Sequence, residues 1–169
     1  IEKGARRLRL LRGGNVIGEY PVRLGLNPYG HKQREGDFRT PEGTYQLSRR
    51  NPRSEFFLSV EVSYPNAEDR ARARRSGTRP GGLIMIHGQP NVPRKTPDYY
   101  ASSDWTDGCI AVSNSDMVDI WLRTTLGTAI ENGFRLYVNE QGGKLGGREI
   151  EFVKVDDESE PSKGADNVN

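Results

Sequence analysis

The chain has 169 residues, with 25 lysine and arginine residues against 23 aspartate and glutamate residues and a formal net charge of +2. This length is sufficient for one domain with its own hydrophobic core, and the near balance of charges argues against a general nucleic-acid-binding protein. No apolar run reaches the roughly 18 residues of a membrane-spanning helix, so the sequence predicts no transmembrane segment. Because the chain begins at Ile1 rather than at a methionine, we expect that an upstream signal sequence has been removed.

The first half of the chain predicts mainly β structure. Gly13 and Gly14 provide the turn of a hairpin. Residues 25–43 are rich in glycine, proline and charge, which predicts a long loop, and loops of this length usually serve a functional site. Four segments have the alternating or β-branched pattern of strands, at residues 6–12, 16–24, 44–49 and 56–64.

The second half predicts a buried strand between two helical segments. The wholly apolar run at residues 83–86 suits a central strand, and residues 88–105 predict a second long loop. Helices are expected over residues 67–75, after a cap at Asn66, and over residues 115–126, after a cap at Ser113 or Asn114.

The remaining residues predict closing strands and a polar tail. The strands are expected at residues 129–130, 134–138 and 149–155. Residues 156–169 have almost no apolar content, which predicts disorder. The sequence therefore predicts one domain over residues 1–155, mainly β with one or two helices.

Cys109 is the only cysteine of the chain and directly follows an Asp-Gly turn. A lone cysteine is more often a small buried apolar residue than a nucleophile, so its surroundings must decide between these interpretations. His87 stands at the end of the predicted central strand, and the loop between the two residues is long enough to bring them together. An imidazole that takes the proton of a thiol creates a nucleophile for acyl transfer. Gly108 permits close approach of a carbonyl substrate, and the amides around Cys109 are candidates for an oxyanion site.

The sequence predicts neither a metal site nor another cofactor. The two histidines, His31 and His87, lie far apart, and a single cysteine cannot form an internal disulfide. We expect His31 to be solvated. The arginine-rich residues 70–75 predict a solvent-facing helix, with contact to an anionic wall or membrane surface as the alternative.

Three short motifs stand in order along the chain: EGDFRTPEGTY at residues 35–45, IMIHG at residues 84–88 and WTDGCIAV at residues 105–112. Together they resemble the YkuD-type L,D-transpeptidases of bacterial cell walls, and most closely a YafK-like branch of that family. The resemblance extends from about residue 7 to residue 130. It implies a β-sandwich or barrel-like catalytic domain.

The resemblance also implies roles for individual residues. Cys109 matches the acylated nucleophile, His87 the general base, and Gly108 together with Cys109 the oxyanion-hole turn. Asp107 stands where much of the family has a second histidine, and Ala111 where asparagine or arginine is common. These departures leave the Cys–His pair intact and bear on the substrate and the acceptor.

Arg39 is a candidate for binding a carboxylate of the stem peptide, because its planar guanidinium suits that group. An ion pair with Asp37 or Glu42 that stabilises the turn is equally compatible with the sequence. The substrate-binding residues predicted here are Arg39, Gly88, Trp105, Thr106 and Asp107.

The residues that flank the nucleophile allow more than one interpretation. Asp107 is a candidate for orienting the imidazole or for holding a substrate amine, and it is also an ordinary residue for an Asp-Gly turn. A backbone carbonyl near Gly88 is a second candidate for the group that orients the ring. Trp105 is expected either in a pocket wall or in the core.

A peptidoglycan enzyme is the function that the resemblance implies. Such enzymes attack the amide after the L-centre of a diamino acid in a tetrapeptide stem, release D-alanine and hold the stem as a thioester. An amine acceptor then gives a cross-link or, when it is a lysine of an envelope lipoprotein, an anchored protein, whereas water gives hydrolysis. The branch includes amidases that cleave protein-to-wall links, so transpeptidase and hydrolase both stay open. A catalytically inactive wall-binding module is the alternative of another class.

The family resemblance implies further expectations about location and inhibition. The enzyme is expected in the periplasm or cell envelope, with peptidoglycan stem peptides as partners, a role in cell-wall biogenesis and cell shape, and no cofactor. Acylation of Cys109 by carbapenems is a corollary of the thioester chemistry.

Overall fold

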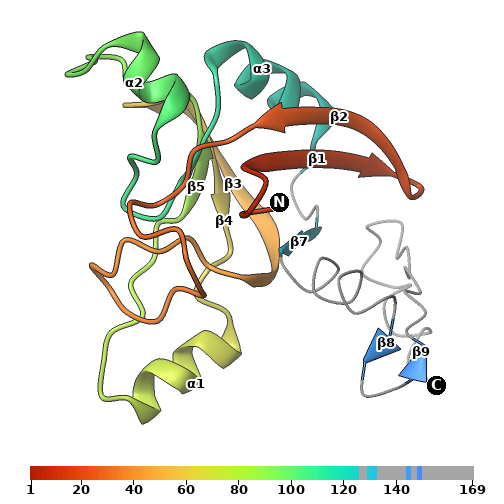
Figure 1. Cartoon of the computed structure of the whole chain (residues 1–169), viewed down its shortest axis with the longest axis vertical. Helices are drawn as coiled ribbons and strands as arrows, with labels where there is room; N and C mark the ends of the chain where they lie inside the picture. Colours follow the sequence, from red (N-terminus) through yellow and green to blue (C-terminus); the bar gives the residue numbers. More distant parts are fainter. Residues whose placement is uncertain (126–128, 133–143, 146–147, 150–169) are drawn as a thin grey trace. The chain divides into compact units, whose positions relative to one another are not determined.

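A computed structural model of the protein describes residues 1–125, 129–132, 144–145 and 148–149 (Figure 1). The chain divides into two compact units, Ile1–Phe134 and Arg135–Asn169. In the second unit the described residues form one antiparallel pair, β8 (Lys144–Leu145) with β9 (Arg148–Glu149). The predicted strand at 134–138, nearly all of the one at 149–155 and the tail at 156–169 lie outside the described residues.

The first unit begins with the predicted hairpin, which is confirmed. Strand β1 (Arg7–Arg12) pairs in antiparallel fashion with β2 (Asn15–Pro21). The turn passes through Gly13 and Gly14, both with positive φ, a conformation that glycine adopts without steric cost. Leu8 and Tyr20 face each other across the pair and are both buried.

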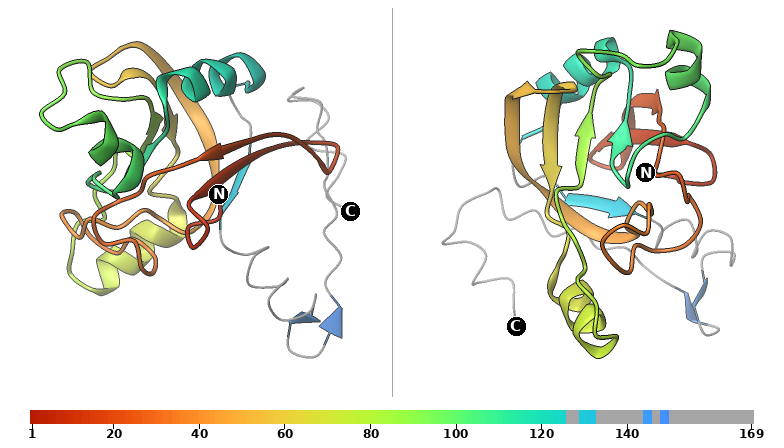
Figure 2. Two further views of the ribbon diagram at one scale, coloured as in Figure 1. Left: turned by 45° about the horizontal axis from the view of Figure 1, so that its top comes forward. Right: turned by 90° about the vertical axis from the view of Figure 1, so that its left-hand side faces the viewer.

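A five-stranded sheet in the order β6-β5-β4-β3-β7 forms the centre of the first unit (Figure 2, right). Only the β5–β6 pair is parallel. The strands are β3 (Gly43–Ser54), β4 (Phe57–Val62), β5 (Met85–His87), β6 (Ile110–Ala111) and β7 (Ala129–Asn132).

Helix α3 (Asn114–Arg123) contacts β4 and contributes to the core of this unit. Its Met117 and Ile120 are fully buried, and Ser113 accepts the amide hydrogen bond that makes it the cap, as predicted. The core combines alternate strand residues and these two helical residues with residues next to the strands, among them Val22, Leu24, Leu47, Val60, Val62, Ile84, Ile86, Ile110, Met117 and Ile120.

The structure has three helices among its described residues, where one or two were expected. Helix α1 (Ala67–Arg75) begins at the predicted cap Asn66 and lies at the opposite end of this unit from the other two (Figure 1). Helix α2 (Pro97–Ser102) was missed because its segment is rich in proline, although Thr96 caps it and Pro97 suits its first turn. The fold is mainly β, as predicted, and its sheets are not closed into a barrel.

Strand β5 begins at Met85, two residues later than predicted. Leu83 has a φ of 55°, which is incompatible with an extended strand, and its side chain is exposed. Strand β6 was not predicted, since two residues give no periodicity to detect. Among the described residues, no helix is long and apolar enough to cross a membrane.

Candidate active site

The parallel register of β5 and β6 brings Cys109 and His87 to one face of the sheet. Ile86 pairs with Ile110 and His87 with Ala111, so the residue before β6, Cys109, lies beside Met85. Side chains alternate between the two faces of a strand, and both isoleucines are buried in the core. His87 and Cys109 therefore project from the opposite face, on neighbouring strands.

The thiol of Cys109 lies against the main chain of the segment before β5. Its Sγ accepts a hydrogen bond from the Met85 amide at 3.4 Å and donates one to the Leu83 carbonyl at 3.5 Å. Burial raises the pKa of the Cys109 thiol, and the Asp107 carboxylate adds to this effect, whereas the Met85 amide and the charge of Lys32 oppose it. The resting thiol is therefore protonated at neutral pH.

His87 is 4% exposed, and its orientation is fixed by the main chain. Its Nδ1 lies 2.7 Å from the carbonyl oxygen of Gly88, which can only accept, so Nδ1 carries the proton. Burial lowers the pKa of His87 to about 4, although the Gly88 carbonyl acts in the opposite direction. The ring is thus neutral, and no described residue forms a hydrogen bond with its Nε2 lone pair.

Two aromatic rings enclose the His87 imidazole. Phe56 lies with its ring centre 4.6 Å from that of His87, and Trp105 meets the imidazole edge-on at 5.6 Å. The Trp105 ring also contacts Tyr100 at 5.0 Å. Trp105 therefore packs against the imidazole, and its place in a pocket wall stays a prediction. These rings help to bury the base.

The turn before Cys109 is held from within by Thr106. The Thr106 hydroxyl donates to the Cys109 carbonyl at 2.7 Å and accepts from the Gly108 amide at 3.1 Å. Gly108 has a φ of 129°, and a Cβ on it would lie 2.6 Å from the carbonyl oxygen of Arg39. Only glycine fits this position. Because Thr106 already accepts the Gly108 amide hydrogen, the Cys109 amide is the better candidate for an oxyanion donor.

The segment after β2 holds the same turn from outside. Arg23 and Ala111 exchange two backbone hydrogen bonds of 2.8 Å. Thr106 in turn donates to the Leu24 carbonyl at 3.1 Å and accepts from the Leu26 amide at 3.0 Å. The nucleophile turn is thus fixed at both ends by a neighbouring chain segment.

Gly88 has a tight position directly after β5. A Cβ on Gly88 would lie 2.5 Å from Asn114 Oδ1 and 3.2 Å from the carbonyl oxygen of Phe56, so a larger residue would displace the loop. Its carbonyl, rather than the Asp107 carboxylate, is the group that contacts the His87 ring. Asp107 is exposed and forms no hydrogen bond with His87.

Arg39 has its main chain at the nucleophile turn and its side chain in a separate pocket. Neither expected ion pair forms, because Asp37 pairs with Lys32 and Glu42 with Lys3. The Nε of Arg39 is buried and has no hydrogen-bond partner in the part of the chain that the structure describes.

Sequence reasoning missed Lys32, which is 3% exposed and lies 2.8 Å from Asp37 Oδ1 through its Nζ. Burial alone would raise the pKa of Asp37. The hydrogen bonds from Lys32 and three backbone amides outweigh this effect and lower the pKa to about 2. A lysine in a polar loop gives no sequence signal of burial.

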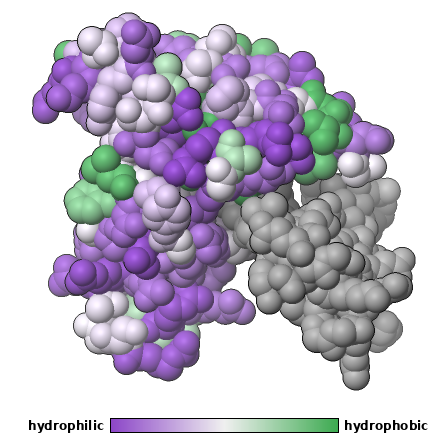
Figure 3. Space-filling view, in the orientation of Figure 1, coloured by the Kyte–Doolittle hydropathy of each residue, from purple (hydrophilic) through white to green (hydrophobic). Residues whose placement is uncertain are grey.

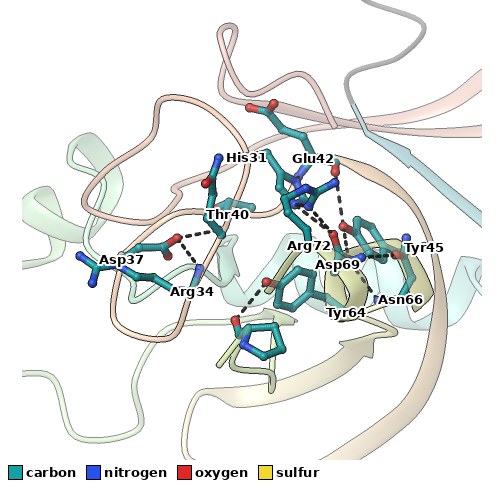
Figure 4. A network of polar contacts seen from close by, with 12 residues as sticks. His31, Arg34, Asp37, Thr40, Glu42, Tyr45, Tyr64, Asn66, Asp69 and Arg72 are labelled. Atoms are coloured by element: carbon teal, nitrogen blue, oxygen red, sulfur yellow. Dashed lines mark hydrogen bonds and ion pairs between the residues drawn. The ribbon is translucent and has the colours of Figure 1, made fainter. Parts of the chain in front are cut away.

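His31 is not solvated as expected, but lies in a polar network at helix α1 (Figure 4). Its Nε2 is 3.0 Å from Asp69 Oδ1, and its Nδ1 accepts the Glu42 amide at 3.0 Å. Asp69 also accepts from the Tyr45 hydroxyl at 2.9 Å and from the Asn66 amide at 3.0 Å. Both nitrogens of His31 are therefore committed to structural contacts.

A cavity of about 560 Å³ adjoins β6 on the side of the second long loop. Prolines and the Tyr100 ring make it largely apolar, and Arg23, Lys95 and Asp116 add charged groups. Two further lining residues are close in sequence to the site: Ala111 is two residues after Cys109, and Gln89 is two residues after His87. The cavity thus lies beside the ends of β5 and β6, and neither Cys109 nor His87 is among its lining residues.

The L,D-transpeptidase catalytic domain family, YkuD, matches residues 1–131. The chain belongs to this family. Over 75 residues it is 41% identical to the putative L,D-transpeptidase YafK of Escherichia coli strain K12, a match that covers 43% of the chain and 28% of YafK. The predicted family is thus confirmed, and the match spans little more than a quarter of this relative.

Solved structures agree with this assignment. The helical cell shape determining protein Pgp2 of Campylobacter jejuni matches with a TM-score of 0.60 and 27% identity, over 77% of the chain and 44% of Pgp2. Bd1075 of Bdellovibrio bacteriovorus matches with a TM-score of 0.54 and 27% identity, over 79% of the chain and 46% of Bd1075. An L,D-transpeptidase of Xylanimonas cellulosilytica matches with a TM-score of 0.51 and 18% identity, over 78% of the chain and 57% of that protein. At this identity the match supports the fold alone.

Proposed function

We propose that the protein is a cysteine-dependent acyltransferase that acts on peptidoglycan stem peptides through a thioester on Cys109. The observation that carries this proposal is the register of β5 and β6, which puts the side chains of Cys109 and His87 on neighbouring strands and on the same face of the sheet. The Gly88 carbonyl holds the proton on Nδ1, so the lone pair of His87 Nε2 is available to accept the thiol proton.

In the first half-reaction a carbon–sulfur bond replaces a carbon–nitrogen bond, and one proton passes from the thiol to the leaving amine. As the Cys109 sulfur attacks the peptide carbonyl, its proton passes to His87 Nε2, and the Cys109 amide stabilises the oxyanion. The carbon–nitrogen bond then breaks, and His87 returns the proton to the leaving amine. Because both groups start neutral and the imidazole is buried, ion-pair formation is postponed until a substrate is bound.

The residues around this pair have supporting roles. Thr106 and Gly108 position the turn, Gly88 orients the base, and Trp105 excludes water from it. Asp107 is exposed beside the thiol, where it can meet the amine of a stem peptide. Retention of both Cys109 and His87 argues against an inactive wall-binding module.

The acceptor determines the overall reaction. An amine from a second stem or from an envelope lipoprotein gives transpeptidation, and water gives hydrolysis of the stem or of a protein-to-wall link. The first half-reaction is common to all of these. The similarity to Pgp2, a helical cell shape determining protein, supports a role in cell shape, and we propose that the protein acts in the cell envelope by remodelling the wall.

The test is covalent labelling by meropenem, read by intact-mass spectrometry. The wild-type protein is expected to gain the mass of one meropenem, and Cys109→Ala is expected to gain none. A wild-type protein with a reduced thiol and no adduct would contradict the proposal. Incubation with tetrapeptide muropeptides and with a muropeptide-linked lipoprotein fragment then distinguishes the reactions: cross-linked dimers indicate a transpeptidase, and released fragment indicates an amidase.

A further inference from the structure

A second cavity, of about 360 Å³, lies between the loop at residues 25–43 and helix α1. Arginines line it from both sides: Arg34 and Arg39 come from the loop, and Arg72 comes from the helix. The face of the first unit that Figure 3 shows is mainly hydrophilic. Neither Arg34 nor Arg72 takes part in the proton transfer between Cys109 and His87.

The one carboxylate that lines this cavity cannot neutralise the arginines. Asp37 already accepts four hydrogen bonds, from the Lys32 ammonium and from the amides of Gln33, Arg34 and Arg39. Its charge is matched by that of Lys32, which is itself buried. The guanidinium groups that line the cavity therefore retain a net positive charge.

Two of these guanidinium groups have no ion-pair partner among the described residues, those of Arg34 and Arg39. The Nε of Arg39 is moreover buried without an acceptor, which is a costly state for a charged donor. Arg72 contacts Asp69 through one terminal nitrogen at 3.0 Å. Planar guanidinium donors of this kind are matched by the paired oxygens of a carboxylate or phosphate.

The cavity adjoins the nucleophile turn through Arg39. The carbonyl oxygen of Arg39 lies against Gly108, only 2.6 Å from the position of a Cβ there, while its side chain lines the cavity. An extended peptide of four residues spans about 13 Å. Because one residue, Arg39, both contacts the nucleophile turn and lines the cavity, a tetrapeptide bound at Cys109 is a suitable length to place another of its groups there.

We propose that Arg34, Arg39 and Arg72 form an anion-binding pocket that holds a free carboxylate of the peptide substrate while the scissile carbonyl lies at Cys109. The inference rests on the proposed function for its substrate. It extends the site from the nucleophile turn to helix α1, and it assigns the pocket to selection of carboxylate-bearing donors.

The test measures binding without turnover. Cys109→Ala protein is titrated by calorimetry with a diaminopimelate-containing tetrapeptide stem and with the same peptide in which every carboxylate is a carboxamide. We expect the carboxamide to bind roughly ten-fold more weakly, since one charged hydrogen-bonded contact is lost. Arg34→Gln and Arg39→Gln, each added to Cys109→Ala, are expected to weaken binding of the carboxylate peptide by a similar factor.

Arg74→Gln is the matched control, because Arg74 is an exposed residue of the same helix and does not line the cavity. Equal binding of the two peptides, or equal binding by Arg34→Gln and Arg74→Gln, would overturn the proposal. Inorganic phosphate that binds in an Arg34-dependent manner without displacing the tetrapeptide would assign the cavity to phosphate and would also overturn it. Meropenem labelling of the wild-type chain reports on the proposed function separately, so the two failures are distinguishable.

Discussion

The two histidines of this protein lie in two polar sites of opposite character. His31 has a carboxylate partner in Asp69 and so has the usual appearance of a catalytic pair, but both of its ring nitrogens are occupied. His87 has only a backbone carbonyl as partner, and its Nε2 has none among the described residues. The uncommitted lone pair, rather than the presence of a carboxylate, therefore distinguishes the proposed base from the structural residue.

Burial also acts differently at the two sites. In the Asp69 network the buried polar groups form hydrogen bonds with one another, and these bonds stabilise the start of helix α1 and the loop beside it. The Cys109 and His87 site leaves a half-buried thiol and a buried imidazole neutral, which costs stability and preserves reactivity. Substitutions at the first site should therefore change mainly stability, and substitutions at the second should change mainly chemistry.

Replacement of the two histidines should give the largest contrast. His87→Gln is expected to slow acylation by meropenem by about 10³-fold, because it removes the general base. His31→Gln should leave the rate within about two-fold under conditions where the protein is folded. The rates are measured by intact-mass spectrometry over time, and similar losses in both variants would show that the two histidines do not differ in role.

Removal of the carboxylate at the structural site should reduce stability rather than chemistry. Asp69→Ala leaves the Asn66 amide without its acceptor and the Tyr45 hydroxyl with only the more distant Glu42 carbonyl, at 3.3 Å. We expect the free energy of unfolding to fall by about 3 kcal/mol. Glu68→Ala, at the exposed neighbouring position, should change it by less than about 0.5 kcal/mol. Urea unfolding measures both. Unchanged stability of Asp69→Ala would show that the network does not stabilise the fold.

The pH dependence of stability should come from the reactive site. The pKa of His87 is lowered from 6.5 to about 4, so between these values the unfolded chain binds a proton that the folded chain does not. The free energy of unfolding should therefore fall by about 2 kcal/mol between about pH 7 and pH 4.5. His87→Gln should remove most of this slope in urea unfolding. Asp37, with a pKa of about 2, contributes only at lower pH.

Two glycines with positive φ should separate backbone strain from close packing. Gly108→Ala places a Cβ 2.6 Å from the Arg39 carbonyl, whereas Gly36→Ala meets nothing within 4 Å. Both variants incur the cost of a positive φ, so the difference between them measures the clash with the Arg39 carbonyl. We expect this clash to make Gly108→Ala less stable than Gly36→Ala by about 1 kcal/mol. Only Gly108→Ala should also slow acylation by meropenem. Equal effects would indicate that the packing at the nucleophile turn is loose.

Much of the fold follows from local sequence signals. The hairpin turn at Gly13 and Gly14, the caps at Asn66 and Ser113, and the alternating strands each depend on neighbouring residues and were predicted. Helix α2 and strand β6 are short, and tertiary contacts decide them. The strand β6 pairing with β5 is what places Cys109 on the face of His87, and it has no sequence signature of its own.

The candidate site was predictable in its residue types but not in its polar contacts. The motifs around His87 and Cys109 predicted this pair of residues as the candidate site. The sequence of the long loop gave no sign that Lys32 is buried or that His31 has structural partners. Charged residues in a polar loop look alike in sequence, and only the folded chain determines which of them find partners.

The most direct test of thioester formation on Cys109 is capture of the acyl-enzyme with a natural donor. Wild-type protein is mixed with a tetrapeptide stem, quenched with acid at early times and analysed by intact-mass spectrometry. We expect a mass gain equal to the mass of the tetrapeptide stem minus the mass of the released D-alanine. Peptide mapping should locate this adduct on Cys109, and Cys109→Ala should not form it. Release of D-alanine with no such adduct at any time, or an adduct that persists in Cys109→Ala, would contradict thioester formation on this residue.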